Sequence, residues 1–226
     1  RMVLLNSPSN PTGGIHGPRT LAQVAEAARR HDLRVLSDEI YMRLVYDAQD
    51  RETASIASLP GMAERTIIAD GFSKTYAMTG WRLGFGIMPE GLAAKMDLLL
   101  THSVGCTATF TQFAGLEAVL GPQERVDEVL AEFRRRRDLI VAGLNKLPGI
   151  RCPMPRGAFY AFPNIEAYGR SSEEVADYLL EEAGVAVLPG TAFGQNGEGY
   201  LRLSYANSLE NLEAALGRMA DALAQL

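Results

Sequence analysis

The chain has 226 residues, of which 47% are hydrophobic and 22% are charged, a composition typical of a globular protein with a substantial core. Its formal net charge is -5, so the chain has no excess of positive charge that would attract the phosphate backbone of a nucleic acid. We therefore expect no nucleic-acid partner. The sequence has no run of about 18 apolar residues, so we expect no membrane partner either.

The first part of the chain alternates short apolar runs with helical patterns, as βαβ units do. A helix is predicted to begin at Pro18, where the missing N–H costs nothing. Strands are predicted at residues 2–5, 33–37, 66–70 and 83–88. This order indicates an α/β fold with a mostly parallel sheet. Because the sequence enters the first strand at once, we expect the chain to be part of a longer protein.

After residue 89 the pattern becomes helical, with helices predicted at residues 91–101, 109–120 and 126–147. The break at Gly121-Pro122 is the predicted boundary between two domains, residues 1–121 and 122–226. The second domain is predicted to be α+β, with strands near residues 158–162, 185–188 and 200–205 and helices at residues 172–182 and 209–224. Ser171 and Glu174 have capping-box spacing. The four arginines at 134–137 are expected on the solvated face of a long helix.

Three stretches rich in polar side chains follow strands of the predicted parallel sheet. They are NSPSNPTGG at residues 6–14, SDEIY at residues 37–41 and DGFSKTYAMTGWRLG at residues 70–84. Because ligands bind beyond the carboxyl ends of parallel strands, a site is expected where these stretches lie. Each stretch alone would suit a turn, a surface carboxylate or a solvated lysine, but together they indicate a functional site. The isomers of the Ser7-Pro8 and Asn10-Pro11 bonds are left open.

The order and spacing of these stretches resemble the fold-type I aminotransferases, in particular the class I and II group that includes aspartate aminotransferases and uses pyridoxal 5'-phosphate (PLP). SKTYAMTGWRLG at residues 73–84 matches the lysine motif of this family along its whole length, and YLRLSYA at residues 200–206 resembles its substrate-carboxylate strand. The resemblance implies the aspartate aminotransferase-like PLP-transferase fold. It also implies that residues 1–121 are the C-terminal part of the large PLP-binding domain and residues 122–226 the small domain.

The resemblance implies a role for each residue around the cofactor. Lys74 would carry PLP as a Schiff base and act as general base and acid. Asp38 would keep the pyridine nitrogen protonated, and Tyr41 would hydrogen-bond the phenolic oxygen and tune the cofactor. Ser73 and Arg82 would bind the phosphate.

Asn10 and Arg202 are implied to contact the substrate. Asn10 would share the phenolic oxygen of PLP with the tyrosine and also lie against the substrate. Arg202 sits in a predicted strand in which Tyr200, Arg202 and Ser204 share one face while Leu201, Leu203 and Tyr205 share the other. By resemblance, its guanidinium clamps the substrate α-carboxylate and thereby fixes the Cα–H bond. No metal ion is expected.

The implied function is a PLP-dependent aminotransferase that moves an amino group from an amino acid to a 2-oxo acid by a ping-pong mechanism, most simply of the aspartate type. Family members are longer at the N-terminus, and that part carries residues that cross a dimer interface, so we expect a homodimer in the full-length form. For these 226 residues alone we expect weak PLP binding and slow or no turnover. A PLP-dependent C–S or β-lyase and the PLP-sensing domain of a transcription regulator are the alternatives. The donor stays open among acidic, aromatic and small apolar amino acids.

The two cysteines, Cys106 and Cys152, lie far apart in the sequence and lack the spacing of a metal site. They predict no disulfide framework. A reducing, cytoplasmic setting is therefore expected.

Overall fold

The computed structural model describes residues 1–51 and 55–226, which divide into two compact units. Unit 1 comprises Arg1–Pro8 and Ile15–Glu128, and unit 2 comprises Ser9–Gly14 and Val129–Leu226. The predicted boundary at residues 121–122 lies between helices α5 (Thr109–Leu120) and α6 (Glu124–Leu144), whereas the units divide inside α6. The assignment of the two units to the large and small domains of an aminotransferase stays a prediction.

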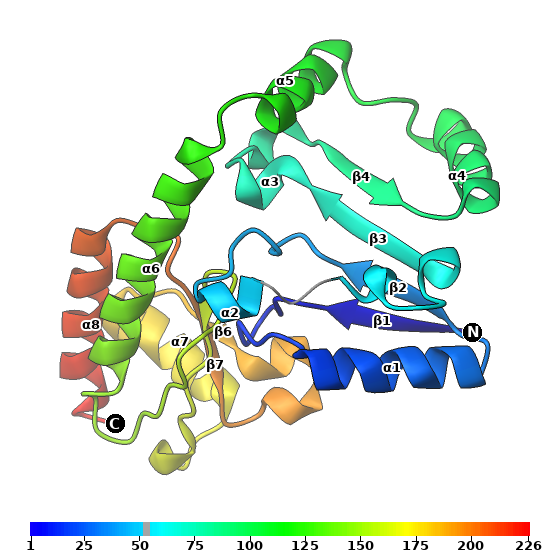
Figure 1. Ribbon diagram of the computed structural model, residues 1–226. Helices are drawn as coiled ribbons and strands as arrows, with labels where there is room; N and C mark the ends of the chain where they lie inside the picture. The colour runs from blue at the N-terminus through cyan, green and yellow to red at the C-terminus, as the bar shows by residue number, and fades with distance from the viewer. Residues whose placement is uncertain (52–54) are drawn as a thin grey trace. The chain divides into compact units, whose positions relative to one another are not determined.

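Unit 1 is built on a four-stranded sheet with the strand order β1-β2-β3-β4 (Figure 1). The first three strands, β1 (Met2–Asn6), β2 (Arg34–Asp38) and β3 (Thr66–Gly71), run parallel, and β4 (Gly84–Ile87) is antiparallel to β3. The register pairs Asn6 with Asp38 and Asp38 with Ala69. The carboxyl ends of the three parallel strands therefore lie side by side.

The core of unit 1 lies on one face of this sheet, under helix α1 (Pro18–Arg30). The helix begins at the predicted proline and buries three small or branched side chains on one face, Leu21, Ala25 and Ala28. These side chains pack with Leu5 and Val35 of the strands. Alternate residues of β1, Met2 and Leu4, are exposed on the opposite face. The short helices α2 (Ala48–Arg51) and α3 (Phe72–Thr75) complete the connections.

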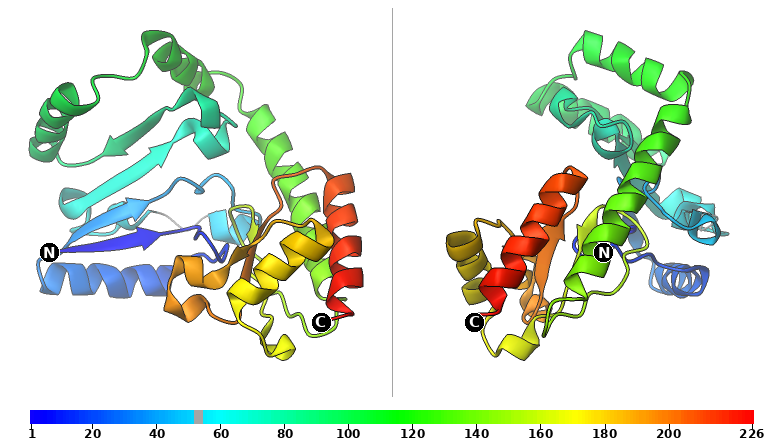
Figure 2. Two further views of the ribbon diagram at one scale, coloured as in Figure 1. Left: turned by 180° about the vertical axis from the view of Figure 1, so that it is seen from behind. Right: turned by 90° about the vertical axis from the view of Figure 1, so that its left-hand side faces the viewer.

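Helix α4 (Glu90–Ser103) and helix α5 lie next to β4, at the opposite end of the sheet from β1 (Figure 2). They leave many large apolar side chains uncovered: Leu98, Leu99, Leu100, Val104, Phe110, Phe113, Leu116, Val119 and Leu120. We call this set the α4–α5 apolar surface. Large apolar side chains that are exposed in this number on two helices indicate an interaction surface.

Unit 2 contains a three-stranded antiparallel sheet with the order β5-β7-β6. Its strands are β5 (Tyr160–Ala161), β7 (Leu201–Ser204) and β6 (Leu188–Pro189), and its helices are the second part of α6, α7 (Ser172–Ala183) and α8 (Leu209–Leu223). Helices α6 and α8 run close together at Gly143, where an added Cβ would lie 2.2 Å from the Leu216 side chain. The alternation predicted for β7 is confirmed, with Leu201, Leu203 and Tyr205 buried.

Local features test several of the sequence predictions. The capping box is present: the Ser171 hydroxyl accepts from the Glu174 N–H, and the Glu174 carboxylate accepts from the Ser171 N–H. Both X-Pro bonds left open, Ser7-Pro8 and Asn10-Pro11, are cis. Over the described ranges, the chain has no helix with the length and apolar character needed to cross a membrane.

One residue of the arginine run departs from the prediction of a solvated helix face. The side chain of Arg137 is only 9% exposed, and its Nη1 donates to the Pro155 carbonyl oxygen at 3.3 Å. Arg137 therefore contacts a loop of unit 2 and does not face solvent.

Candidate functional site

The ends of β2 and β3 bring an amine and a phenol together in unit 1. Asp38 is the last residue of β2, and its carboxylate accepts from the Ile40 N–H at 3.3 Å. The chain then leads to Tyr41, whose ring is buried. Lys74 follows β3, and its Nζ lies 5.8 Å from the centroid of the Tyr41 ring. The register of the parallel strands thus places Asp38, Tyr41 and Lys74 at one edge of the sheet.

Two adjacent carboxylates, Asp38 and Glu39, have different surroundings. Glu39 is buried, and its carboxylate accepts hydrogen bonds from the hydroxyls of Ser37 and Ser55. Because two hydroxyls inside the protein already donate to the Glu39 carboxylate, we assign this residue a role in stabilising the fold. Asp38 is half-buried at the sheet edge and is the carboxylate in a position to meet a ligand.

A third carboxylate, Asp70, lies near the end of β3. Burial raises the pKa of the Asp70 carboxyl, and the negative charges of Glu39 and Asp38 raise it further. A hydrogen bond of 2.6 Å from the Gly71 N–H opposes this effect on the pKa. Asp70 therefore lies close enough to Asp38 and Glu39 for their negative charges to act on it.

The segment after β3 is unusual in its backbone. Gly71 leads into the short helix α3, and a Cβ there would lie 3.0 Å from the Leu83 carbonyl oxygen, so a larger residue would have to displace its neighbour by a few tenths of an ångström. Ala77 and Arg82 both have positive φ, at 53° and 55°. Such conformations cost about 1–3 kcal/mol each and cluster at functional sites. The Arg82 Nη1 donates to the Thr79 carbonyl oxygen at 2.7 Å, which holds the turn closed.

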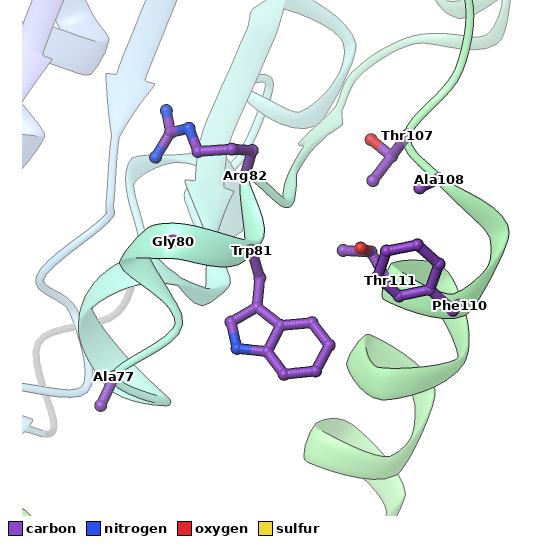
Figure 3. Close-up of a pocket in the computed structure, with 8 residues that line it drawn as sticks. All are labelled: Ala77, Gly80, Trp81, Arg82, Thr107, Ala108, Phe110 and Thr111. Carbon is purple, nitrogen blue, oxygen red and sulfur yellow. The ribbon is translucent and has the colours of Figure 1, made fainter.

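A pocket of about 600 Å³ lies beside this segment, between the turn and the start of α5. One wall is formed by Ala77, Gly80, Trp81 and Arg82, and the other by Thr107, Ala108, Phe110 and Thr111. Figure 3 shows the Trp81 indole extending toward α5, while the guanidinium of Arg82 extends away from it. The indole therefore belongs to the pocket, whereas the guanidinium points away from α5 and donates through Nη1 to the Thr79 carbonyl oxygen.

In unit 2, Arg202 lies on β7 and has no carboxylate ion-pair partner among the residues that the structure describes. Its Nη1 donates to the Asn10 Oδ1 at 3.1 Å, and within residues 1–51 and 55–226 its Nε is buried without a hydrogen-bond partner. Because a buried donor without a partner is costly, an anionic ligand that reaches this Nε would be favoured.

The loop that carries Asn10 is fastened to unit 2 through Gly13. The Gly13 carbonyl oxygen accepts from the N–H groups of Arg156 and Gly157, each at 2.9 Å. Gly13 has a φ of +66°, and a Cβ there would lie 2.6 Å from the Pro155 Cβ and 2.8 Å from the Gly157 carbonyl oxygen. The close approach therefore requires glycine.

We expect Gly13→Ala to lower the free energy of unfolding by about 1–3 kcal/mol, because alanine must adopt a positive φ and also clash with backbone atoms. Urea unfolding followed by circular dichroism measures this change. The matched control is Gly217→Ala, since Gly217 lies within α8 with open space around it. The control should be neutral or stabilising by up to about 1 kcal/mol. Equal stability of the two variants would contradict the tight fit of Gly13.

Comparison with known proteins identifies the family. A family model described as aminotransferase class I and II matches residues 1–219. The chain belongs to this family. It is 46% identical over 225 residues to aromatic-amino-acid aminotransferase 2 of Thermococcus litoralis, with 99% of this chain and 57% of that protein covered. It is 45% identical to the aspartate aminotransferase of Pyrococcus abyssi, again with 99% and 57% covered.

The family likeness extends to solved structures. The crystal structure of the aromatic aminotransferase from Pyrococcus horikoshii matches at 44% identity with a TM-score of 0.95, covering all of this chain and 60% of that one. These matches confirm the predicted family and the aspartate aminotransferase-like fold. The chain spans little more than half the length of these relatives, between 57% and 60% of each.

The structure divides the seven site residues predicted from the sequence between the two units. Unit 1 contains Asp38, Tyr41, Ser73, Lys74 and Arg82, and unit 2 contains Asn10 and Arg202. The sequence did not single out Asp70 or two rings next to Arg202, Tyr160 and Phe193. Asp70 ends an apolar run directly before the lysine motif, which is a signal that could have identified it.

Proposed function

We propose that this chain is the part of a PLP-dependent aminotransferase that carries the cofactor lysine. We further propose that the whole protein transfers an amino group from an amino acid to a 2-oxo acid by a ping-pong mechanism. The aspartate and aromatic aminotransferases of this family depend on PLP. The observation that supports the proposal best is the position of the Lys74 Nζ, 5.8 Å from the Tyr41 ring at the edge that also holds Asp38.

The donor set of unit 1 has the chemistry that PLP requires. A primary amine suits the aldehyde carbon, a carboxylate suits a protonated ring nitrogen, and a phenol suits the phenolic oxygen. A hydroxyl and a guanidinium suit the phosphate dianion. Lys74, Asp38, Tyr41, Ser73 and Arg82 supply these groups within one unit, so the residues fit the cofactor.

When bound, the cofactor supplies an electron sink for negative charge that develops at the substrate Cα. Lys74 would take the proton from that Cα and return it as a general acid. Asp38 would hold a proton on the ring nitrogen, because a carboxylate favours the cationic form. Tyr41 would donate to the phenolic oxygen, and Ser73 and Arg82 would bind the phosphate.

Arg202 would bind the α-carboxylate of the amino acid or 2-oxo acid, and Asn10 would hold the guanidinium at its other edge. The hydrogen bond of 3.1 Å between the Arg202 Nη1 and the Asn10 Oδ1 supports this arrangement. A guanidinium in a fixed orientation binds a carboxylate through two parallel hydrogen bonds. The α-carboxylate would thereby be oriented for proton removal at Cα.

The proposed substrates are of the aspartate type. Because the relatives include both aspartate and aromatic aminotransferases, the donors to compare first are aspartate and phenylalanine. A homodimer is proposed for the full-length form, supported by the α4–α5 apolar surface, which offers the exposed apolar area that an interface needs. A cytoplasmic setting is proposed because Cys106 and Cys152 are both free thiols.

The proposal is tested by adding PLP to the purified chain, reducing with borohydride and mapping peptides by mass spectrometry. We expect a pyridoxyl group on Lys74. The same test on the full-length protein shows whether the rest of the sequence is needed for binding. Absence of the adduct from both forms would refute the proposal. Pyruvate release from a cysteine conjugate would indicate a lyase instead.

A further inference from the structure

Two aromatic rings pack against the guanidinium of Arg202. Its Cζ lies 4.6 Å from the centroid of the Tyr160 ring and 4.8 Å from the centroid of the Phe193 ring. Tyr160 belongs to β5, and Phe193 ends a short 3-10 helix that follows β6. Because β7 lies between β5 and β6, Tyr160 reaches Arg202 from the strand on one side, and Phe193 reaches it from the 3-10 helix that follows the strand on the other side.

These ring contacts restrict the guanidinium without using its donors. A cation is attracted to the face of an aromatic ring, and the guanidinium can stack there because its own faces are weakly hydrated. Its N–H groups point outward in the guanidinium plane, where Nη1 already donates to Asn10. Tyr160 is 6% exposed and Phe193 36%, so one ring is fixed in the core and the other stands at the rim.

The remaining donors are therefore placed to bind an anion in the plane of the guanidinium. Within the two described ranges, the Nε of Arg202 has no hydrogen-bond partner. A planar carboxylate can meet such a donor edge with both oxygens in the same plane. A tetrahedral anion can also meet this edge with two oxygens, but a further oxygen then lies out of that plane.

We propose that Tyr160 and Phe193 are positioning residues that fix the plane of Arg202 and make it selective for planar carboxylates over tetrahedral anions. This inference rests on the proposed function, in which Arg202 binds the substrate carboxylate. The two rings take no part in proton transfer. They act on substrate choice and alignment through the arginine alone.

The first test needs neither cofactor nor activity. In the cofactor-free chain labelled with ¹⁵N-arginine, the Nε–Hε signal of Arg202 is assigned through the loss of one signal in Arg202→Lys. Tyr160→Leu and Phe193→Leu should each shift this signal, because the ring current is lost, and should speed rotation about the Nε–Cζ bond several-fold. Tyr160→Phe, which keeps the ring, should leave the signal close to its original position.

The matched control for the first test is Phe162→Leu. Phe162 stacks on Tyr200 with centroids 5.1 Å apart, so the change removes a ring from the same unit but not from Arg202. Unfolding curves establish that each variant is folded. If Tyr160→Leu fails to fold, Phe193→Leu at the rim carries the test. An unmoved Arg202 signal in the folded leucine variants would overturn the proposal.

The second test measures selectivity in the PLP-loaded protein. An amino acid and its 1-aminophosphonic analogue are titrated against the cofactor absorption band, and the ratio of their Kd values is compared between variants. We expect each leucine variant to reduce the preference for the carboxylate by about 5- to 10-fold, in line with the strength of a cation–π contact. Tyr160→Phe should retain the preference.

The two tests separate failure of the inference from failure of the proposed function. If Lys74 takes up no PLP in either this chain or the full-length protein while the Arg202 signal responds to the ring changes, the proposed function fails and the ring contacts stand. If PLP binds and the carboxylate preference is the same in all variants, the function stands and the selectivity role is refuted.

Discussion

Lys74→Ala is expected to abolish the pyridoxyl adduct and to lower transamination by the full-length protein by about 10⁴-fold, the upper end of what a positioned acid–base group contributes. The alanine variant loses both the amine that would carry the cofactor and the base that would take the proton from the substrate Cα. In unit 1 no other lysine lies at the carboxyl edge of the sheet, since Lys95 belongs to α4. The rate is measured with aspartate and 2-oxoglutarate.

Lys95→Ala is the matched control for this prediction. Lys95 is exposed on α4, so its removal should leave both the adduct and the rate unchanged. A second variant, Lys74→Arg, keeps a positive charge but supplies no amine that can be deprotonated. It should be as inactive as the alanine variant. A pyridoxyl group that persists on another lysine in Lys74→Ala would show that the lysine has been assigned wrongly.

Sequence patterns predicted the long helices well, because each carries a long run of periodic residues, whereas the four-residue helices α2 and α3 were not predicted. Helix α5 has the predicted bounds, residues 109–120. The strands of unit 2 were less predictable. Residues 185–187 were predicted as strand, but Gly184 adopts the left-handed conformation and the Val185 N–H donates to the Leu179 carbonyl oxygen, which is the end of a helix. The apolar run there packs as a helix terminus, so β6 begins only at Leu188.

The residues at the sheet edge of unit 1 could be predicted because they follow strands directly. Asp38 and Lys74 each come after a recognisable apolar run, and parallel strands place their ends together. The rings next to Arg202 could not be predicted in the same way. Tyr160 and Phe193 meet Arg202 only because the strand order is β5-β7-β6, and that order depends on pairing between distant segments. Arg137 was mistaken for a surface residue for a related reason, since its partner lies on a loop 18 residues away.

Asp38→Asn is expected to lower kcat of the full-length protein by about 10²- to 10³-fold, the cost of removing one preorganised electrostatic contact. Asparagine has nearly the same shape and can still accept from the Ile40 N–H through its side-chain oxygen, so the turn after β2 should keep its form. It lacks the negative charge that would hold a proton on the ring nitrogen. PLP should therefore still attach to Lys74, and borohydride reduction should still yield the adduct.

Glu39→Gln separates this role of Asp38 from a general need for negative charge at the edge of the sheet. Glu39 accepts from the hydroxyls of Ser37 and Ser55, so its change should reduce stability, because hydrogen bonds to a charged group are among the stronger ones. The folded fraction should keep most of its kcat, since Glu39 is turned into the core. Comparable losses of kcat in both variants would mean that the charge of the whole edge matters and that Asp38 has no special contact with the cofactor. A loss confined to Asp38→Asn, with the adduct retained, would instead locate the effect at the ring nitrogen, because neither cofactor attachment nor the fold of unit 1 would have changed.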